Sequence, residues 1–198
     1  MVKILAAGDI HDNKEIMEKL AKKAINEKVD LIILAGDIHD YNTGDKEILS
    51  PLLETKKRIL FVPGNCDTLD ECSELKKKAK SIDGYYVTYN EVGIAGIGSA
   101  GWTLEHDLSD FLIIKKQMIK MKQKKRVLVS HLHAAGTLAE KMGNIVGWTG
   151  DSILREAVET FQPDILISAH IHEAEGVEDK IGKTRVIQVG RKGTILEI

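Results

Sequence analysis

The chain contains the same six residues twice, and each copy holds carboxylate and imidazole groups that can bind a metal ion. Residues 7–12 read Ala-Gly-Asp-Ile-His-Asp, and residues 35–40 repeat this hexapeptide. Two acids and two histidines brought close together, with no basic residue among them, would repel and titrate one another unless a cation held them. If the fold brings the two copies together, the repeat therefore predicts a metal site.

An apolar run precedes each copy of the hexapeptide, and a helical pattern separates the copies. Residues 2–6 and 31–34 are typical of buried β-strands, whereas residues 13–28 place apolar side chains at helical spacing after a candidate N-cap. A right-handed crossover sets both strands in one parallel sheet, with Asp9 and Asp37 at the edge where open α/β sheets bind ligands. Either aspartate alone is more simply interpreted as a helix cap, but the pair with its histidines favours a metal site.

Three further strand ends carry polar side chains of the same kinds. Strands are expected over residues 58–62, 126–130 and 164–168. Together the five strand ends deliver Asp9 and His11, Asp37, Asn65, His131, and His170 with His172. Oxygen donors with imidazoles suit divalent first-row metals, whereas a structural zinc site more usually shows cysteines at short spacing. Two such ions, about 3.5–4 Å apart, are the usual apparatus for displacement at phosphorus, because they generate hydroxide from a shared water and stabilise the charge of the transition state.

The other segments indicate further helices and a second sheet. Helices are expected over residues 45–57, interrupted near Pro51, and over residues 68–81, 107–124 and 151–162. Residues 85–89 and 92–97 alternate in polarity on either side of a turn, which favours antiparallel strands. A second sheet is therefore expected to begin in this region.

Two glycine-containing segments are interpreted as irregular or turn structure. Residues 134–149 show no clear period and are expected to form a loop over the site. Residues 184–189 and 194–198 are expected to form a closing hairpin around residues 190–193.

Composition and charge limit the class of protein. With 198 residues, 43% of them hydrophobic and 29% charged, the chain is expected to form one domain over residues 1–198. A formal charge of -2 gives no global field that recruits nucleic acid, although a local patch is not excluded. No apolar stretch has the length of a membrane span, and the N-terminus enters a strand without a signal-peptide pattern, so we expect no membrane partner and a cytoplasmic location. Cys66 and Cys72 are expected to be free thiols.

The motifs follow one another in an order that resembles the calcineurin-like metallophosphoesterase superfamily. Those that carry the resemblance are Asp9-Ile10-His11, Gly36-Asp37, Gly64-Asn65-Cys66-Asp67, His131 and Ala169-His170-Ile171-His172. They extend over nearly the whole chain, and small microbial members of phosphodiesterase type also carry Gly-Asn-Cys-Asp. The resemblance implies an α/β fold of four layers, α-β-β-α, in which two mixed sheets pack face to face with helices outside.

The same resemblance implies a ligand set for two divalent metal ions. One ion would be held by Asp9, His11, Asp37 and His172. The other would be held by Asp37, Asn65, His131 and His170, so that Asp37 bridges the pair. Manganese is the first expectation for the metal, and iron, nickel, cobalt and zinc accept the same donors. The residues expected to act in catalysis are Asp37, Asn65, Cys66 and His133.

The chain departs from the family pattern at Ala169 and Cys66. Ala169 replaces the usual glycine, at little expected cost because alanine is also small. Cys66 replaces a histidine that in many members is thought to protonate the leaving group or bind the phosphate. A thiol, with an unperturbed pKa of about 8.5, is a poorer general acid and carries no positive charge. We therefore expect substrates with good leaving groups to be least affected by the change.

Several polar residues lie next to these motifs. His133 shares a strand face with His131 and is interpreted either as lining the site or as a packed residue. His39, the counterpart of His11 in the second hexapeptide, is expected at the rim of the site or behind a ligand. The neighbouring acids are expected to cap helices or turns, or to orient loop backbone, namely Asp12, Asp40 and Asp67.

The sequence therefore predicts a dinuclear metal-dependent phosphoesterase that acts on diesters, at least activated ones, with a phosphate-ester small molecule or a nucleotide as substrate. Phosphomonoesterase and nucleotide pyrophosphohydrolase activities are alternatives, because metals recognise only the phosphate and selectivity is expected from the loops at residues 38–50, 99–107 and 134–149. A non-catalytic protein-binding scaffold, as in the retromer subunit of the superfamily, is disfavoured because all seven ligands are present. A metallo-β-lactamase-like hydrolase is disfavoured because Ala135-Gly136 stands where its motif continues with Asp-His.

Overall fold

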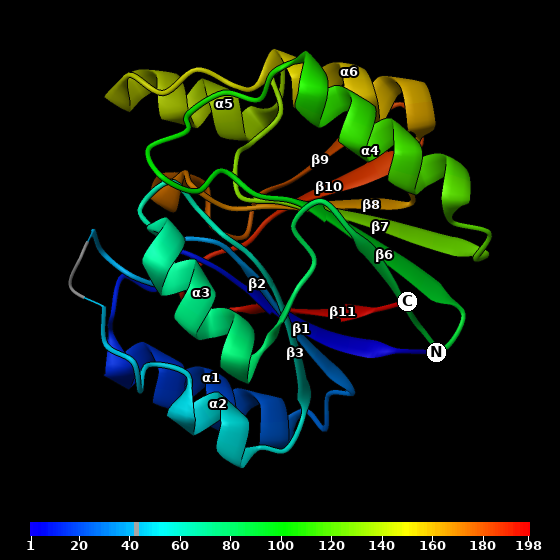
Figure 1. Ribbon diagram of the computed structural model, residues 1–198. Helices are drawn as coiled ribbons and strands as arrows, with labels where there is room; N and C mark the ends of the chain where they lie inside the picture. The colour runs from blue at the N-terminus through cyan, green and yellow to red at the C-terminus, as the bar shows by residue number, and fades with distance from the viewer. Residues whose placement is uncertain (42–43) are drawn as a thin grey trace.

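The strands of the computed structural model form two sheets that pack face to face (Figure 1). The strands are β1 Lys3–Ala7, β2 Leu31–Ala35, β3 Arg58–Val62, β4 Lys80–Ser81, β5 Tyr86–Tyr89, β6 Val92–Ile97, β7 Lys125–Ser130, β8 Ile165–Ser168, β9 Glu178–Ile181, β10 Thr184–Gln188 and β11 Thr194–Glu197. The first sheet has the order β11-β1-β2-β3-β4, and the second has the order β5-β6-β7-β8-β10-β9. The structure describes residues 1–41 and 44–198, so residues 42–43 of the expected selectivity loop 38–50 lie outside the described residues.

Parallel pairing joins the strands whose ends carry the candidate ligands. β1, β2 and β3 are parallel neighbours in the first sheet, and β6, β7, β8 and β10 are parallel neighbours in the second. The strands β11, β5 and β9 run antiparallel to their neighbours, so both sheets are mixed. Parallel strands end at the same edge of a sheet, so each sheet presents its candidate ligands at one edge.

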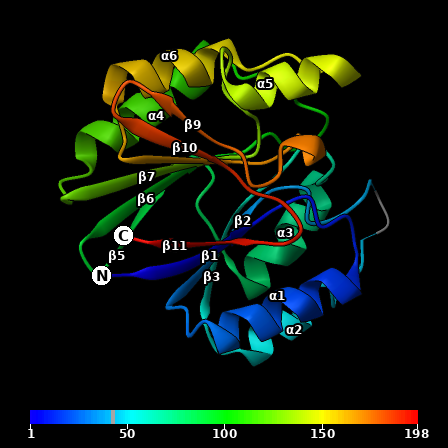
Figure 2. The same cartoon turned by 180° about the vertical axis from the view of Figure 1, so that it is seen from behind.

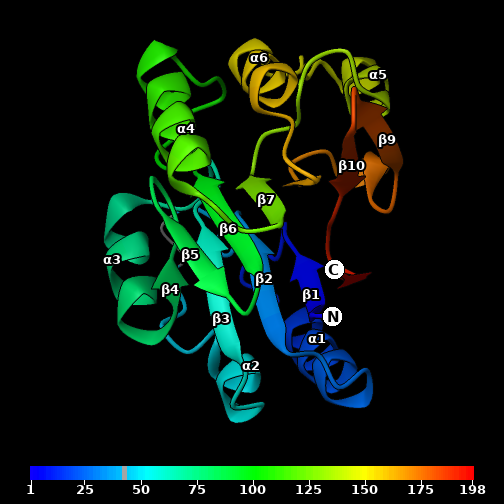
Figure 3. The same cartoon turned by 90° about the vertical axis from the view of Figure 1, so that its right-hand side faces the viewer.

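Helices cover the outer face of each sheet (Figures 2 and 3). The helices are α1 Lys14–Asn26, α2 Ser50–Glu54, α3 Leu69–Lys78, α4 Leu108–Lys120, α5 Leu138–Gly143 and α6 Ser152–Phe161, with short 3-10 helices η1 Asn144–Val146 and η2 His172–Ala174. Helices α1 and α2 pack on the first sheet, and α4 and α6 pack on the second. This α-β-β-α arrangement confirms the expected fold class. None of the helices in the described residues is both long and apolar enough to cross a membrane.

The central strands, of which β1 is an example, are apolar on both faces because both faces are covered. In β1, Ile4 joins the apolar cluster between the sheets, whereas Leu5 joins the cluster beneath α1 and α2. Successive residues of a strand point to opposite faces, so one uninterrupted apolar run supplies both clusters. Val127 of β7 and Ile167 of β8 belong to the same inter-sheet cluster as Ile4. The two sheets therefore share one core.

Helices α1 and α6 each begin at a residue whose side chain caps the first turn of the helix. The Asn13 side chain accepts a hydrogen bond from the backbone N–H of Ile16 at 3.1 Å, which confirms the predicted N-cap of α1. The Asp151 side chain accepts from the backbone N–H of Leu154 at the start of α6. At the other end of α6 the chain leaves the helix before Pro163, which cannot supply the next N–H group.

The predicted closing hairpin over residues 184–198 is wrong. Strand β10 pairs with β8 and β9 in the second sheet, whereas β11 pairs with β1 in the first. Residues 190–193 carry the chain between the sheets, and the Lys23 ammonium donates to the carbonyl oxygens of Lys192 and Gly193 at 3.0 and 2.7 Å. Two glycines in four residues resemble a tight turn, but the pairing of these strands depends on partners far away in the sequence. The hairpin that does form joins β9 to β10.

Two other predicted segments differ in extent from the structure. Residues 134–149 contain α5 and η1 and are not a loop throughout. Helix α5 begins after Thr137, whose side chain accepts from the backbone N–H of Glu140, and it is too short to produce a hydrophobic period. Within residues 45–57 only α2 is an α-helix, because Pro51 fits the first turn of a helix but not its interior.

Candidate metal centre

The loops formed by the two hexapeptides are hydrogen-bonded to each other. The backbone N–H of Asp9 donates to the Gly36 carbonyl at 3.1 Å, and that of Ile10 donates to the Asp37 carbonyl at 2.7 Å. Asp9, His11 and Asp37 adopt left-handed backbone conformations, with φ of 56°, 49° and 48°. Such conformations cost about 1–3 kcal/mol each in a non-glycine residue and persist where the surrounding structure fixes them. The fold therefore holds these three side chains in set directions.

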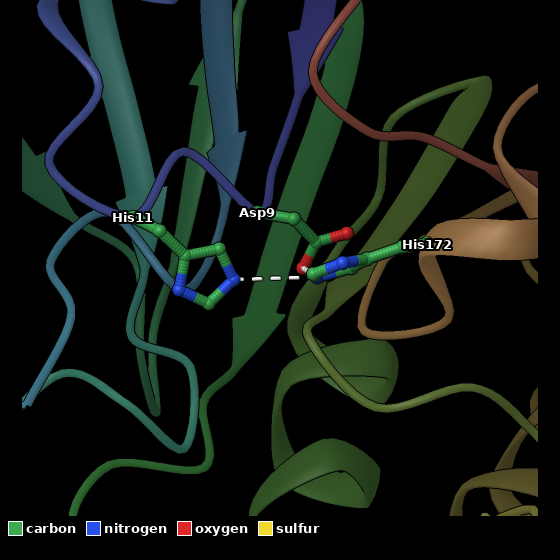
Figure 4. A group of neighbouring side chains, drawn as sticks. All are labelled: Asp9, His11 and His172. Carbon is green, nitrogen blue, oxygen red and sulfur yellow. Dashed lines mark hydrogen bonds and ion pairs between the residues drawn. The ribbon is translucent and has the colours of Figure 1, made fainter. Parts of the chain in front are cut away.

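One group of candidate metal donors joins the end of β1 to η2. Figure 4 shows a ring nitrogen of His11 directed at the His172 ring, which is seen edge-on, with the Asp9 carboxylate beside them. The Nε2 atoms of His11 and His172 are 3.3 Å apart, and His172 Nε2 lies 3.9 Å from Asp9 Oδ1. The second oxygen of Asp9, Oδ2, is buried and has no hydrogen-bond partner in the described part of the chain. These donor atoms lie within 4.8 Å of one another, close enough for one cation to contact all three residues.

A second group of donors lies beside the first and joins both sheets. His131 Nε2 is 3.4 Å from Asp37 Oδ2, 3.0 Å from Asn65 Oδ1 and 3.2 Å from His170 Nδ1. Asp37 and Asn65 follow β2 and β3 of the first sheet, whereas His131 and His170 follow β7 and β8 of the second. The donors of this group therefore converge across the seam between the two sheets.

Asp37 lies between the two groups of donors. Its Oδ2 atom is 3.8 Å from His11 Nε2 in the first group and 3.4 Å from His131 Nε2 in the second. Its Oδ1 atom accepts a hydrogen bond from the backbone N–H of Cys66 at 2.8 Å. One carboxylate oxygen is thus fixed by the backbone, and the other faces histidines of both groups.

Hydrogen bonds behind the donors set their orientation. His131 Nδ1 lies 2.9 Å from the Ala35 carbonyl oxygen, which can only accept, so Nδ1 donates to that oxygen and the ring directs Nε2 at the cluster. Asn65 Nδ2 donates to the Tyr41 hydroxyl at 3.1 Å, which directs the amide oxygen towards His131. The backbone N–H of His170 donates to Asp9 Oδ1 at 3.1 Å and links the two groups.

Burial and mutual proximity shift the pKa values of the cluster in opposite directions. Burial raises the pKa of Asp9 to about 6. Burial alone would also raise the pKa of Asp37, but the neighbouring His131 ring and the Cys66 N–H hold it well below its usual range. Burial and the charge of His131 lower the pKa of His170 to about 3, and burial lowers the pKa values of His11 and of His172, so these three rings are neutral at pH 7.

The donor set fits divalent metal ions. Two carboxylates, one amide oxygen and four imidazoles are the ligand types that first-row divalent metals accept. A cation would take up the unpartnered Asp9 oxygen and the facing lone pairs of neutral His11 and His172. The Asp37 charge works against burial and raises the pKa of His131 to about 9, so a cation bound at Nε2 releases a proton from this ring.

The second-copy histidine, His39, lies apart from these donor groups. Its Nδ1 atom is 2.7 Å from Asp12 Oδ1, and its backbone N–H donates to Asp67 Oδ1 at 2.8 Å. The other Asp67 oxygen accepts from the backbone N–H of Gly64, so Asp67 orients loop backbone as expected. Asp12 also accepts from the backbone N–H of Asp40 at 3.0 Å, which is the expected turn-capping contact. His39 therefore joins three loops behind the candidate ligands.

Cys66 and Ala169, the two residues that depart from the family pattern, are both buried. Cys66 is a free and buried cysteine whose Sγ lies 3.5 Å from Asn65 Nδ2 and within reach of His11 and Asp37. Burial and the Asp37 charge raise the pKa of this thiol, so it is neutral at pH 7. Ala169 is fully buried, and a Cβ added at Gly8 would lie 2.8 Å from the Ala169 methyl group, so the small side chain fills the space between these loops.

His133 lies beside His170, which belongs to the second group of donors. Its ring stacks on that of His170, with centroids 5.9 Å apart and planes at 17°, and it is buried. Neither ring nitrogen has a hydrogen-bond partner within the described residues. His133 does not belong to the three-residue donor groups of the described chain, but it lines a pocket next to His170.

Sequence reasoning missed four residues that contribute to the site. The Arg191 guanidinium Nε donates to the Asp9 carbonyl at 2.7 Å, from the segment misread as a hairpin turn. Tyr41 stacks on Trp102 with ring centroids 3.8 Å apart, and Trp148 lies edge-on to His170 at 4.8 Å. An arginine between two glycines and single aromatic residues in loops give no periodic signal, so their positions follow only from the fold.

Comparisons with known proteins agree with this fold. The family model described as calcineurin-like phosphoesterase matches residues 2–174. An uncharacterized protein of Methanocaldococcus jannaschii is 29% identical over 208 residues, an alignment that covers 96% of this chain and 89% of that protein. Among solved structures, TT1561 of Thermus thermophilus has a TM-score of 0.77 at 16% identity, covering 98% of this chain and 93% of its own. A dimetal phosphatase from Danio rerio has a TM-score of 0.63 at 11% identity, covering 98% and 88%.

Proposed function

Because this chain belongs to the calcineurin-like phosphoesterase family, we propose that it is a dinuclear metal-dependent phosphoesterase that prefers phosphodiesters. The observation that carries this proposal is the position of Asp37 Oδ2, which faces His11 at 3.8 Å and His131 at 3.4 Å. A carboxylate shared between two groups of donors is the arrangement that a pair of ions requires. The inter-sheet core common to both halves supports a single functional domain over residues 1–198.

The proposed ligands divide between two ions, with manganese as the first candidate. One ion takes Asp9, His11, His172 and the shared Asp37. The second takes Asn65, His131, His170 and the same Asp37. Two of the three donor groups within 4.8 Å in the described residues support this division, because each contains two histidines and one carboxylate of the proposed set; the third group, His11, Asp37 and Cys66, places Asp37 beside a ligand of the first ion. When bound, such a pair of ions activates water and polarises the phosphoryl oxygens of the substrate.

The protein residues orient the ligands and control the charge that the substrate meets. The Ala35 carbonyl fixes the tautomer of His131, and the Cys66 N–H fixes one oxygen of Asp37. Arg191 places its guanidinium beside Asp9, where its positive charge also lowers the pKa values of His11 and His172 after the effect of burial. These rings therefore stay neutral and available as donors near pH 7.

The thiol of Cys66 supports a preference for diesters with good leaving groups. A phosphodiester carries one negative charge near neutral pH, whereas a phosphomonoester carries close to two. An imidazolium at position 66 would compensate the second charge and protonate a poor leaving group, but the buried thiol is neutral and holds its proton tightly. We therefore expect an activated diester to be hydrolysed faster than the matching monoester.

Metal removal and reconstitution test the proposed activity. The protein is treated with a chelator, dialysed, and assayed with bis(p-nitrophenyl) phosphate and p-nitrophenyl phosphate before and after addition of Mn²⁺. We expect chelation to abolish hydrolysis, Mn²⁺ to restore it, and the diester to be the better substrate. Hydrolysis that is unchanged after the metal content has fallen below a few per cent of the protein concentration would contradict the proposal.

A further inference from the structure

A pocket opens beside the candidate metal centre on the side of the second sheet. It has a volume of about 210 Å³, and its lining includes Leu104, Glu105, His133, Trp148 and His170. His170 belongs both to this lining and to the second group of donors. The pocket is therefore adjacent to the place where the metal centre would hold the phosphate of a substrate. The pocket also joins two of the loops, residues 99–107 and 134–149, from which substrate selectivity is expected.

His133 is a buried polar side chain that the rest of the protein does not use. The residue is only 2% exposed, and both of its ring nitrogens lack hydrogen-bond partners among the described residues. Buried polar groups are nearly always hydrogen-bonded in folded proteins, so this ring requires an explanation. Its stacking on His170 fixes the ring plane, and the ring lies in the lining of the pocket.

Trp148 forms an aromatic wall of the same pocket and is held in place by its loop. The backbone N–H of Trp148 donates to the Gly143 carbonyl at 3.0 Å. The Glu140 carboxylate accepts from the backbone N–H groups of Gly136 and Gly150 at 2.7 and 2.9 Å and so fixes both ends of the loop. Trp148 is 39% exposed although the neighbouring chain is ordered by these bonds, so its indole ring is a preformed surface.

We propose that this pocket binds a planar aromatic ring carried by the ester group of the substrate, with Trp148 as the stacking surface and His133 as the hydrogen-bonding partner. This inference rests on the proposed phosphoesterase function and adds a substrate class to it. A volume of about 210 Å³ is below the roughly 300 Å³ at which sites for drug-sized ligands begin, so the pocket takes one ring system and not a long chain.

Two kinds of substrate carry such a ring, and the pocket chemistry separates them. An aryl ester presents a ring without polar edge atoms, whereas a nucleotide presents a base with donors and acceptors along its edge. The His133 nitrogens and the Glu105 carboxylate in the lining match the edge of a base. The Trp148 surface is common to both, because every aromatic ring has a face that stacks.

Matched ligand pairs test the pocket by binding alone. Manganese-loaded protein is titrated calorimetrically with phenyl phosphate and methyl phosphate, and with adenosine 5′-monophosphate and ribose 5-phosphate. We expect the ligand with a ring to bind roughly tenfold or more tightly than its partner in each pair, the size of effect that base stacking on an aromatic side chain produces. Methyl phosphate reports on the metal centre by itself, so a failure of the proposed function is distinguished from a failure of the pocket.

Variants assign the ring preference to the two side chains. Trp148→Ala is expected to reduce both ring preferences, each measured as the ratio of the two affinities within a ligand pair, to below about threefold. Ile145→Ala is the matched control, because Ile145 lies in the adjacent η1, is 83% exposed and is not in the pocket lining. His133→Phe and His133→Gln are expected to weaken adenosine 5′-monophosphate more than phenyl phosphate if the natural ring is a base, and to weaken neither if it is an aryl group.

A spectroscopic measurement gives a second reading of the same contact. The chain has two tryptophans, so in a Trp102→Phe background excitation at a wavelength that tyrosine does not absorb reports on Trp148 alone. We expect phenyl phosphate to quench this fluorescence and methyl phosphate to leave it unchanged. Equal affinities within both ligand pairs, or a ring preference that survives Trp148→Ala, would overturn the assignment of the pocket.

Discussion

The two copies of Ala-Gly-Asp-Ile-His-Asp have the same residues and follow adjacent parallel strands, but their histidines have different surroundings. His11 Nε2 lies 3.3 Å from His172 Nε2, inside the donor cluster. His39 Nδ1 lies 2.7 Å from Asp12 Oδ1, outside it. Residue type and position after a strand are therefore not enough to make a histidine a candidate ligand.

The contacts between the copies explain the difference. The final aspartate of the first copy, Asp12, pairs closely with the histidine of the second copy, His39. The reciprocal contact, between His11 Nδ1 and Asp40 Oδ1, is longer, at 3.8 Å. His172 from the second sheet reaches the first copy and not the second, and the nearest carboxylate to His39 belongs to Asp12. The two copies therefore differ because His172, which follows β8 of the second sheet, lies against His11. As a result His11, and not His39, faces the candidate metal centre.

The largest expected effect distinguishes the aspartates of the two copies. Asp37→Asn removes a charged oxygen shared by both proposed ions, whereas Asp9→Asn affects one ion. Loss of a residue that only supports a metal ligand costs about 10–100-fold in affinity or activity, so loss of the shared ligand should reduce hydrolysis of bis(p-nitrophenyl) phosphate by more than about 100-fold. Metal analysis should find both ions depleted in Asp37→Asn and one retained in Asp9→Asn. Equal losses in the two variants would remove the basis for calling Asp37 the bridge.

The second prediction compares the two histidines directly. His11→Ala should weaken Mn²⁺ binding by at least about tenfold, because it removes a proposed ligand. His39→Ala should keep the metal affinity and lower the free energy of unfolding by about 1–3 kcal/mol, because the buried His39 ring and its hydrogen bond with the half-buried Asp12 carboxylate are lost. Metal titration and urea unfolding of both variants check this. A loss of metal affinity in His39→Ala as large as that in His11→Ala would show that the copies are equivalent.

The third prediction concerns His133. Like His39 it is buried, but unlike His39 it has no carboxylate hydrogen-bonded to its ring within the described residues. Burial lowers the pKa of His133 to about 4, below the value of about 6.5 in the unfolded chain. The folded protein therefore binds fewer protons than the unfolded chain between pH 6.5 and pH 4, and its stability falls as the pH falls through this window. Between pH 7 and pH 4.5 the contribution of His133 to this loss should be about 2–3 kcal/mol.

His133→Phe removes this titration and keeps an aromatic ring in the stack. In urea unfolding of the metal-free protein, the variant should lose about 2–3 kcal/mol less than the wild type on going from pH 7 to pH 4.5. Parallel stability curves of the two proteins over this range would mean that the His133 ring finds a partner on protonation.

The smallest expected effect concerns Cys66, which follows the third strand of the first sheet. If a histidine here protonates poor leaving groups, Cys66→His should raise the hydrolysis of alkyl phosphate esters relative to a nitrophenyl diester. A positioned general acid is worth about 10²–10⁴ in rate, so even a poorly placed one should change the ratio of the two rates by about tenfold. The metal content of each variant is measured alongside the rates. A constant ratio would mean that Cys66 is a packing residue and that the proton comes from elsewhere.

The sequence predicted the parts of the fold that depend on local patterns. The apolar runs of β1, β2, β3, β7 and β8 and the helices α1 and α6 were located to within a few residues, because a strand covered on both faces has a continuous apolar run and a helix packed on one face has periodic apolar residues. The convergence of polar side chains at the ends of these strands followed from parallel pairing. The resemblance to the family implied the four-layer fold, which the structure has.

The errors lie where the structure depends on distant contacts. The segment around Arg191 looks like a turn, but its place is set by Lys23 and by the Asp9 carbonyl, far away in the sequence. The role of His39 depends on Asp12 in the other copy, which no local pattern indicates. The Trp148 wall depends on a helix of six residues, too short for its period to be recognised.

The most direct test of the central claim is the number and spacing of bound manganese ions. Metal-free wild type and Asp37→Asn are titrated with Mn²⁺ and followed by electron paramagnetic resonance. The proposed shared carboxylate predicts two ions per wild-type chain, close enough for their spins to couple, and loss of the coupled signal in Asp37→Asn. A single ion per wild-type chain, or two ions that give only the six-line signal of isolated Mn²⁺, would contradict the dinuclear centre.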